Sequence, residues 1–172
     1  AFYDPLTKLA NRRLLLDRLE HAVLSANRHK ENVAVFMLDL DNFKTINDSL
    51  GHEYGDQLLQ NIADIIQQGI ASEDTVARLG GDEFTIVVSC YKSELELAEI
   101  AEHILLQLEK PIQLNETQVV VSTSIGVSLF PQDGKTPQDL LRSADLAMYH
   151  AKETGKNKFN FYQHEMNERA QE

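Results

Sequence analysis

Two carboxylates, Asp82 and Glu83, stand side by side directly after a pair of glycines. The segments before and after them are rich in β-branched and apolar side chains, which is typical of strands. Gly80 and Gly81 can adopt positive φ at no steric cost, so the sequence predicts a tight hairpin with both carboxylates at its tip. The turn itself does not need two adjacent charges that repel each other. The pair is therefore a candidate for binding a hard cation through oxygen ligands.

A second acidic segment, Asp39-Leu40-Asp41, follows the unbroken apolar run 33–38. Such a run is typical of a central strand that is buried on both faces. Carboxylates at its C-terminal end lie where open α/β sheets place their ligand crevices. Alone, Asp39 would be interpreted as the polar end of a strand. If it faces the acidic hairpin tip, the two segments form a two-metal site suited to phosphoryl transfer.

These motifs resemble the GGDEF family of bacterial diguanylate cyclases. Residues 80–84 match the family signature letter for letter, and other segments follow its pattern along nearly the whole chain. An ordered set of this kind is far more specific than an isolated Gly-Gly-Asp-Glu. The matching segments are Asp4-Pro5-Leu6-Thr7, Asn11-Arg12, Asp39-Leu40-Asp41-Asn42-Phe43-Lys44, Asn47-Asp48, Gly51-His52, Gly55-Asp56, Ser124-Ile125-Gly126-Val127 and Ala144-Asp145-Leu146-Ala147-Met148-Tyr149.

The resemblance implies a diguanylate cyclase, which condenses two GTP molecules into cyclic di-GMP and releases two pyrophosphates by metal-assisted attack of each 3′-hydroxyl. Asp82 and Glu83 would be catalytic, with the division of roles between them left open. Two Mg²⁺ or Mn²⁺ ions per active site would be held by Asp39, the carbonyl of Leu40, Asp82 and Glu83. Each GTP attacks the other, so a homodimer is implied. The alternative is a catalytically silent GTP-binding module that regulates an attached phosphodiesterase domain.

The resemblance also assigns the remaining contacts to GTP. Asn47 and Asp56 would hydrogen-bond the guanine edge, whose N–H donors suit a carboxylate and whose acceptors suit an amide. His52 would flank the base, and three lysines would bind phosphates. Without the resemblance, these residues would be polar helix positions and solvated surface lysines. The full expected GTP-binding set is Phe43, Lys44, Asn47, His52, Asp56, Lys152 and Lys156.

One departure concerns the family's product-inhibition site, an Arg-x-x-Asp sequence just before the signature hairpin. Here Asp74 is present, but Ala71 occupies the position of the arginine. Only Asp74 of that pair remains, and an aspartate offers no positive charge to an anionic ligand. We therefore expect the product-inhibition site to be non-functional.

The elements that position these residues are predicted from caps, turns and apolar periodicity. Helices are expected after N-caps at Asn11, Ser93 and Thr136, the last reaching Lys152 with Gly155 as its C-terminal cap. Two further helices are expected near 44–50 and 53–68. The predicted strands are 33–38, 75–77, 85–88, 112–114, 119–129 and 158–162, with 112–114 and 119–129 paired as a hairpin.

Helices and strands mixed around one sheet predict an α+β fold. The resemblance makes this a five-stranded, mostly antiparallel sheet flanked by helices, like the palm of nucleotidyl cyclases and polymerases. Residues 1–162 are expected to form the GGDEF domain and 163–172 the start of a linker to a possible downstream domain. Because the chain begins without methionine and within a motif, we expect a piece of a larger signalling protein.

Composition limits the classes of partner. At 172 residues the chain is predicted to be one domain with a real core, and its net charge of −11 argues against a basic nucleic-acid interface. No run approaches the roughly 18 apolar residues of a membrane helix, so no direct membrane contact is expected. The location is expected to be cytoplasmic, in a parent protein with an upstream sensor, possible membrane anchor and possible phosphodiesterase domain. The single cysteine, Cys90, is expected to be buried.

Overall fold

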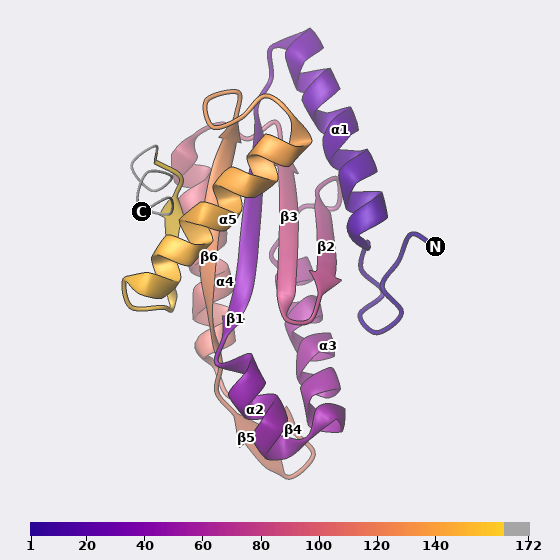
Figure 1. Ribbon diagram of the computed structural model, residues 1–172, viewed down its shortest axis with the longest axis vertical. Coiled ribbons are helices and arrows are strands. Elements are labelled where there is room, and N and C mark those ends of the chain that lie inside the picture. Colours follow the sequence, from indigo (N-terminus) through magenta and orange to yellow (C-terminus); the bar gives the residue numbers. More distant parts are fainter. Residues whose placement is uncertain (164–172) are drawn as a thin grey trace.

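The computed structural model describes residues 1–163 as a five-stranded sheet with helices on both faces (Figure 1). The strand order is β2-β3-β1-β6-β7, and only the β6–β7 pair is parallel. This confirms the expected α+β fold with a mostly antiparallel sheet. The sheet strands are β1 (Val33–Asp41), β2 (Thr75–Gly80), β3 (Glu83–Ser89), β6 (Ser122–Phe130) and β7 (Lys158–Phe161). The helices are α1 (Arg12–His29), α2 (Phe43–Leu50), α3 (His52–Gln68), α4 (Glu94–Glu109) and α5 (Pro137–Glu153).

Strand β1 is the centre of the core, because its alternating side chains enter two different apolar clusters. Val33, Val35 and Met37 pack with residues of α1 and α5 on one face. Phe36 and Leu38 pack with residues of α3 and α4 on the other face. The sheet is therefore a middle layer between α1 with α5 and α3 with α4, and Asp39 and Asp41 lie on the α5 face.

The stretch 112–129 differs from the prediction. The short strand β4 (Ile112–Leu114) pairs with β5 (Thr117–Val119), and the chain then leaves this hairpin to form β6 in the central sheet. Strand β6 is buried along almost its whole length between β1 and β7, an environment that a two-stranded hairpin cannot provide. The predicted pairing of 112–114 with all of 119–129 was therefore wrong. The residues of 119–129 favour strands throughout, so the sequence did not indicate that the chain passes from one sheet to another within this stretch.

The three predicted helix caps are present. The side chains of Asn11, Ser93 and Thr136 each accept a hydrogen bond from a backbone N–H in the first turn of the helix they precede. Helix α5 ends with Gly155 at φ 129° and with the N–H of Lys156 bonded to the Ala151 carbonyl, a glycine-capped terminus of the Schellman type. The caps at Thr136 and Gly155 therefore fix the residues at which α5 begins and ends.

Helix α5 lies directly against β6 because residue 126 has no side chain. A Cβ built on Gly126 would lie 2.0 Å from the carbonyl oxygen of Ala144 and 2.2 Å from the backbone nitrogen of Met148. The close approach holds α5 against the sheet (Figure 1), and Lys152 in the last turn of α5 contacts Asp41 at the end of β1.

Two expectations outside the sheet have clear outcomes. Cys90 is exposed rather than buried, because it follows the end of β3 with φ 56° and its thiol donates to the Glu31 carboxylate at 3.1 Å. None of the helices within residues 1–163 combines the length and apolar character needed to cross a membrane. Apart from Gln163, the predicted linker 163–172 lies outside the described residues.

Candidate active site at the ends of β1 and β6

The signature hairpin places its carboxylates beside the end of β1. Gly80 and Gly81 adopt φ values of 141° and 52°, the left-handed conformations that the turn needs. In the β1–β3 register, Asp39 pairs with Glu83. The backbone N–H of Leu40 donates to the carbonyl of Asp82 at 3.4 Å, which ties the hairpin tip to the strand end. Two acidic segments separated by more than forty residues in sequence therefore meet at one edge.

Asp39 is held in an environment that disfavours its charge. Burial raises the pKa of its carboxyl to about 7, with further contributions from the hydrogen bond and negative charge of Asp82, while Lys152 opposes the shift. Its Oδ1 atom is buried and has no hydrogen-bond partner. Lys152 Nζ lies 3.5 Å from the other oxygen, Oδ2. A buried, unpartnered anionic oxygen beside a second carboxylate fits a divalent cation, which would satisfy both.

Glu83 lies beside this site, opposite Asp39 in the register of β1 and β3. Burial raises the pKa of Glu83, and the charges of Asp145 on α5 and of Asp82 add to the shift, while Arg12 lowers it. Within residues 1–163, no three His, Cys, Asp or Glu side chains already gather as a metal-binding group. The side chains that converge are Asp39 and Asp82, and the expected ligand set is completed by the Leu40 carbonyl and Glu83.

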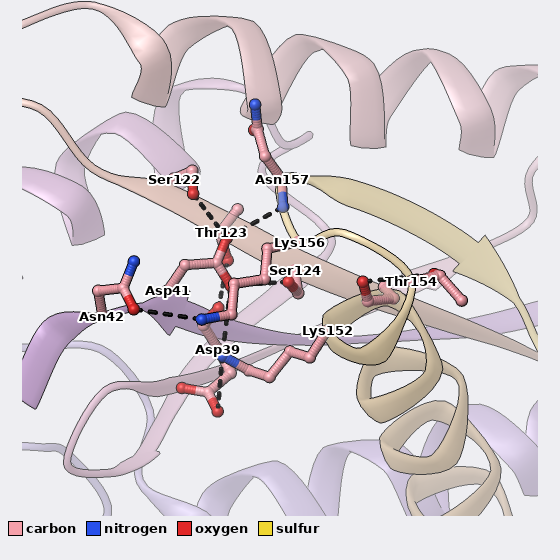
Figure 2. Close-up of polar contacts among 11 residues, drawn as sticks. Asp39, Asp41, Asn42, Ser122, Thr123, Ser124, Lys152, Thr154, Lys156 and Asn157 are labelled. Atoms are coloured by element: carbon pink, nitrogen blue, oxygen red, sulfur yellow. Dashed lines mark hydrogen bonds and ion pairs between the residues drawn. The ribbon is translucent and has the colours of Figure 1, made fainter.

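Asp41 is the most densely hydrogen-bonded carboxylate of this edge (Figure 2). Its Oδ2 accepts from the Ser122 hydroxyl at 2.6 Å, and its Oδ1 accepts from the Ser124 hydroxyl at 2.7 Å. The backbone N–H of Asn157 donates to Oδ2 at 3.0 Å, and Lys152 Nζ lies 3.3 Å from Oδ1. Burial alone would raise the pKa of Asp41, but these donors and the lysine charge bring that pKa below its usual value. Asp41 is therefore a fully satisfied buried anion.

The loop after α5 brings the second predicted phosphate-binding lysine to the same edge. Lys156 Nζ donates to the side-chain oxygen of Asn42, just past the end of β1, at 3.2 Å. The side-chain amide of Asn157 donates to Glu109 at the end of α4 at 2.8 Å. Lys152 and Lys156 thus both reach the β1 terminus from α5 and the loop that follows it (Figure 2).

The predicted guanine-binding residues cluster where α2 meets α3. The Asn47 side-chain nitrogen lies 3.0 Å from Nδ1 of His52. Gly55 makes room for this arrangement, since a Cβ there would lie 2.1 Å from Oδ1 of Asn47 and 3.4 Å from the Phe43 ring. Asp56 follows on the exposed side of α3. The structure therefore brings Phe43, Asn47 and His52 together, and Asp56 is the residue of α3 that follows Gly55.

Lys44 has a different setting from the other two lysines. It is exposed in the first turn of α2, directly after the β1 terminus. Along the chain, Lys44 lies between Asp41 at the acidic edge and Asn47 on the same helix.

Arg78 links the hairpin tip to the N-terminal segment. Its Nη1 contacts both carboxylate oxygens of Asp4 at 3.0 and 3.1 Å, and its Nε donates to the Gly81 carbonyl at 2.9 Å. Asp4 also accepts from the backbone and hydroxyl of Thr7 at 2.9 and 2.8 Å. The sequence assigned Arg78 no role, whereas the structure shows that it holds the signature turn in place.

The expected product-inhibition position lies away from this edge. A cavity of about 630 Å³ is lined by residues that include Ala71, Asp74, Glu73 and Glu96. Burial raises the pKa of Asp74, although its Oδ1 accepts from the backbone N–H of Ser89 at 3.2 Å. Among residues 1–163, those that line the cavity include three acidic side chains and no lysine or arginine.

Sequence reasoning missed Asp41 as a site residue, although a signal was present. Residues i and i+2 of a strand share a face, so Asp39 and Asp41 must point the same way. The register pairs Asp39 with Ser124 and Asp41 with Ser122, which puts two hydroxyls opposite two carboxylates. The alternation within each strand was readable from the sequence, whereas the pairing of β1 with β6 was not.

The mostly antiparallel sheet, the carboxylates and lysines at one of its edges and the polar residues on α2 and α3 form the arrangement expected of a nucleotidyl-cyclase domain. The family model described as "Diguanylate cyclase, GGDEF domain" matches residues 1–158. The chain therefore belongs to the GGDEF diguanylate cyclase family. This confirms the family suggested by the sequence motifs.

Relatives agree with this placement. The bifunctional diguanylate cyclase/cyclic di-GMP phosphodiesterase MucR of Pseudomonas aeruginosa is 44% identical over 172 residues, all of this chain but 25% of MucR. The diguanylate cyclase TpbB of the same species is 44% identical over 153 residues, 88% of this chain and 35% of TpbB. A solved structure of the TpbB GGDEF domain superimposes with a TM-score of 0.96 at 40% identity, covering 99% of both chains. These relatives support a diguanylate cyclase, and the chain spans a quarter to about a third of their length.

Proposed function

We propose that this domain condenses two GTP molecules into cyclic di-GMP and releases two pyrophosphates. The observation that carries the proposal is the buried, unpartnered Oδ1 of Asp39 beside Asp82, at the edge where Lys152 and Lys156 also stand. Carboxylates that repel each other without a ligand suit divalent cations, and the lysines suit the phosphates that such cations bridge.

The proposed roles follow the placement of each side chain. Asp39, the Leu40 carbonyl, Asp82 and Glu83 would hold two Mg²⁺ or Mn²⁺ ions. Bound there, the ions would polarise the α-phosphate and lower the pKa of the attacking 3′-hydroxyl. Asp82 or Glu83 would accept the proton of that hydroxyl.

The other contacts orient the nucleotide. Lys152 and Lys156 would neutralise the β- and γ-phosphates, and Lys44 would face the phosphates from the first turn of α2. Asn47 and Asp56 would hydrogen-bond the guanine edge, flanked by His52 and Phe43. Lys156 provides charge without the planar, two-pronged geometry of an arginine.

One site presents only one GTP, so the reaction requires two domains facing each other. Each 3′-hydroxyl would attack the α-phosphate held by the partner site, which makes a two-fold homodimer the active form. In a longer parent protein, residues 1–162 would form the catalytic domain between an upstream sensor and, by analogy with the bifunctional MucR, a downstream phosphodiesterase domain. The domain would act in the cytoplasm, where GTP is available.

The metal requirement is tested by calorimetry of a non-hydrolysable GTP analogue with and without Mg²⁺. A net charge of −11 and an acidic edge would repel a bare triphosphate, so we expect measurable binding only with the cation. Equal affinity in excess chelator would show that the acidic edge is not a metal site.

Asp56→Ala is expected to weaken binding of GTP far more than binding of ATP. The carboxylate would accept from two guanine donors that adenine lacks at those positions. Hydrogen bonds to a charged group contribute about 1.5–3 kcal/mol, so the expected loss for GTP is about 10- to 150-fold. Calorimetry with both Mg²⁺-nucleotides measures the difference, and equal losses would show that Asp56 does not read the base.

The product is expected not to inhibit this domain through the Ala71–Asp74 position. The cavity there is lined by Glu73, Asp74 and Glu96, which would repel an anionic cyclic dinucleotide. Ala71→Arg should create binding by restoring a charged planar fork. Calorimetry with cyclic di-GMP compares the two proteins. Tight binding by the unmodified domain that is lost in Asp74→Ala would show that another cation serves this site.

A further inference from the structure

We propose that Asp41 is a positioning residue for the phosphate side of the active site. It would set the place of Lys152 and of the loop 154–157 relative to Asp39, without touching the substrate itself. The inference rests on the proposed function, because it assigns the two lysines to the phosphates of GTP.

The whole carboxylate of Asp41 is buried. Asp41 is 2% exposed, yet the other fully buried residues of its strand are all apolar. An apolar residue would pack there without the desolvation cost of a charge, so stability alone does not explain an aspartate. The charge is kept because each of its oxygens accepts from defined donors, and those donors come from three separate parts of the chain.

The donors around Asp41 come from the sheet and from the end of α5 with its following loop. Oδ1 faces the Ser124 hydroxyl and Lys152 Nζ, and Oδ2 faces the Ser122 hydroxyl and the Asn157 N–H. The hydroxyls belong to β6 and hold the carboxylate in one orientation on the sheet. Each oxygen then has one remaining contact, with the end of α5 or with the loop that follows it (Figure 2). The carboxylate therefore joins the edge of the sheet to Lys152 and to the loop that carries Lys156.

The loop 154–157 has an unusual backbone conformation. Gly155, Lys156 and Asn157 have φ values of 129°, 62° and 48°, three consecutive residues in the left-handed region. Non-glycine residues persist in this region only when the surrounding structure fixes them. The Asn157 N–H to Asp41 contact is one such constraint, and it sets the direction from which Lys156 projects toward Asn42.

Lys152 forms ion pairs with two aspartates. Its ammonium lies between Asp41 at 3.3 Å and Asp39 at 3.5 Å. The Asp41 side chain is 1% exposed, whereas that of Asp39 is 20% exposed. Asp41 is thus the fixed partner, and it retains the lysine at the edge when Asp39 turns its charge to another ligand.

The test is calorimetry with Mg²⁺ and α,β-methylene GTP, whose bridging carbon blocks the reaction. Asp41→Asn keeps the side-chain shape but replaces one acceptor oxygen with a donor that faces Lys152 or Asn157. We expect about 10-fold weaker binding of the triphosphate, and GMP binding measured by NMR titration unchanged within about 2-fold. A variant that only loosened the fold would weaken both ligands.

Two comparisons make the result specific. Because Asp41 would act through Lys152 and through the loop that carries Lys156, Asp41→Asn should not weaken triphosphate binding further in a protein that already carries Lys152→Met and Lys156→Met. Asp133→Asn is the matched control: this half-buried carboxylate accepts from Leu129 N–H at the far end of β6, and its loss should leave triphosphate affinity unchanged. If Asp41→Asn does not fold, Ser122→Ala with Ser124→Ala keeps the charge but frees its orientation, and binding should weaken several-fold.

The outcomes separate this inference from the proposed function. Wild-type affinity in Asp41→Asn, equal weakening of GMP, or full additivity with the combined Lys152→Met and Lys156→Met substitutions would overturn the positioning role. Absence of Mg²⁺-triphosphate binding in the wild type would overturn the proposed function instead. In that case hydrogen exchange decides the positioning claim, because the Asn157 amide should lose protection in Asp41→Asn while the amides of α5 keep theirs.

Discussion

Asp39→Asn is expected to abolish cyclic di-GMP synthesis and, at the same time, to stabilise the ligand-free domain. The neutral amide is a poorer metal ligand, so we expect the rate to fall by about three orders of magnitude, equivalent to about 4 kcal/mol of transition-state stabilisation. Without metal, the substitution removes a buried carboxylate with an unpartnered oxygen beside Asp82. Removal of that charge should stabilise the fold by about 1–2 kcal/mol, or roughly 2–8 °C in Tm.

The stability gain should depend on pH in a defined direction. The folded-state pKa of Asp39 is raised to about 7 from an ordinary value of 3.8, so its ionised form is destabilising in the folded protein. The advantage of Asp39→Asn is therefore largest above pH 7 and shrinks as the pH falls from 7 toward 4, where wild-type Asp39 is protonated in the fold. Thermal unfolding in chelator across this range measures it, with Asp133→Asn as a control that should keep its cyclase activity. Loss of stability together with loss of activity would contradict the account.

Gly126→Ala is expected to be the most destabilising single methyl addition in the sheet. The new Cβ would lie 2.0 and 2.2 Å from backbone atoms of α5, and backbone atoms cannot move aside as a flexible side chain can. Overpacking typically costs 1–3 kcal/mol, and contact with a helix backbone puts this change at about 3 kcal/mol or more, roughly 6–12 °C in Tm. Displacement of α5 would also carry Lys152 away from Asp41.

Gly69→Ala makes the same chemical change as a control. Residue 69 has an ordinary φ of −87°. Its added Cβ would lie 3.0 Å from the His103 ring, which can turn away, and 3.6 Å from the Ile66 carbonyl, an ordinary contact distance. We expect a change within about 1 kcal/mol in denaturant unfolding. Equal stability of the two alanine variants would contradict the packing inferred between α5 and β6.

The parts of the fold that depend on local chemistry were predictable. The turn at Gly80 and Gly81 requires positive φ, and the caps at Ser93 and Thr136 satisfy backbone donors of the helices that follow. The apolar run ending at Asp39 was long and uninterrupted, and so it predicted the central strand. Each of these features is written within a few consecutive residues.

The parts that depend on long-range register were not predictable. Asp41 meets Ser122 and Ser124 only because β1 pairs with β6, which is more than eighty residues further along the chain. The exit of β6 from the β4–β5 hairpin carries no glycine or proline signal at Val120, which is exposed. The apolar strand before Cys90 suggested burial, whereas a left-handed residue turns the chain outward there. In each case tertiary pairing decided the outcome.

Joining of two GTP molecules at this acidic edge is tested by incubating the domain, fused to a dimerising coiled coil, with GTP and Mg²⁺. The products are identified by chromatography and mass spectrometry. We expect cyclic di-GMP and two pyrophosphates for each molecule formed, and about a thousandth of that rate from the Asp39→Asn dimer. Intact GTP after incubation of a dimer that binds Mg²⁺-GTP would contradict this expectation and identify a catalytically silent GTP-binding module.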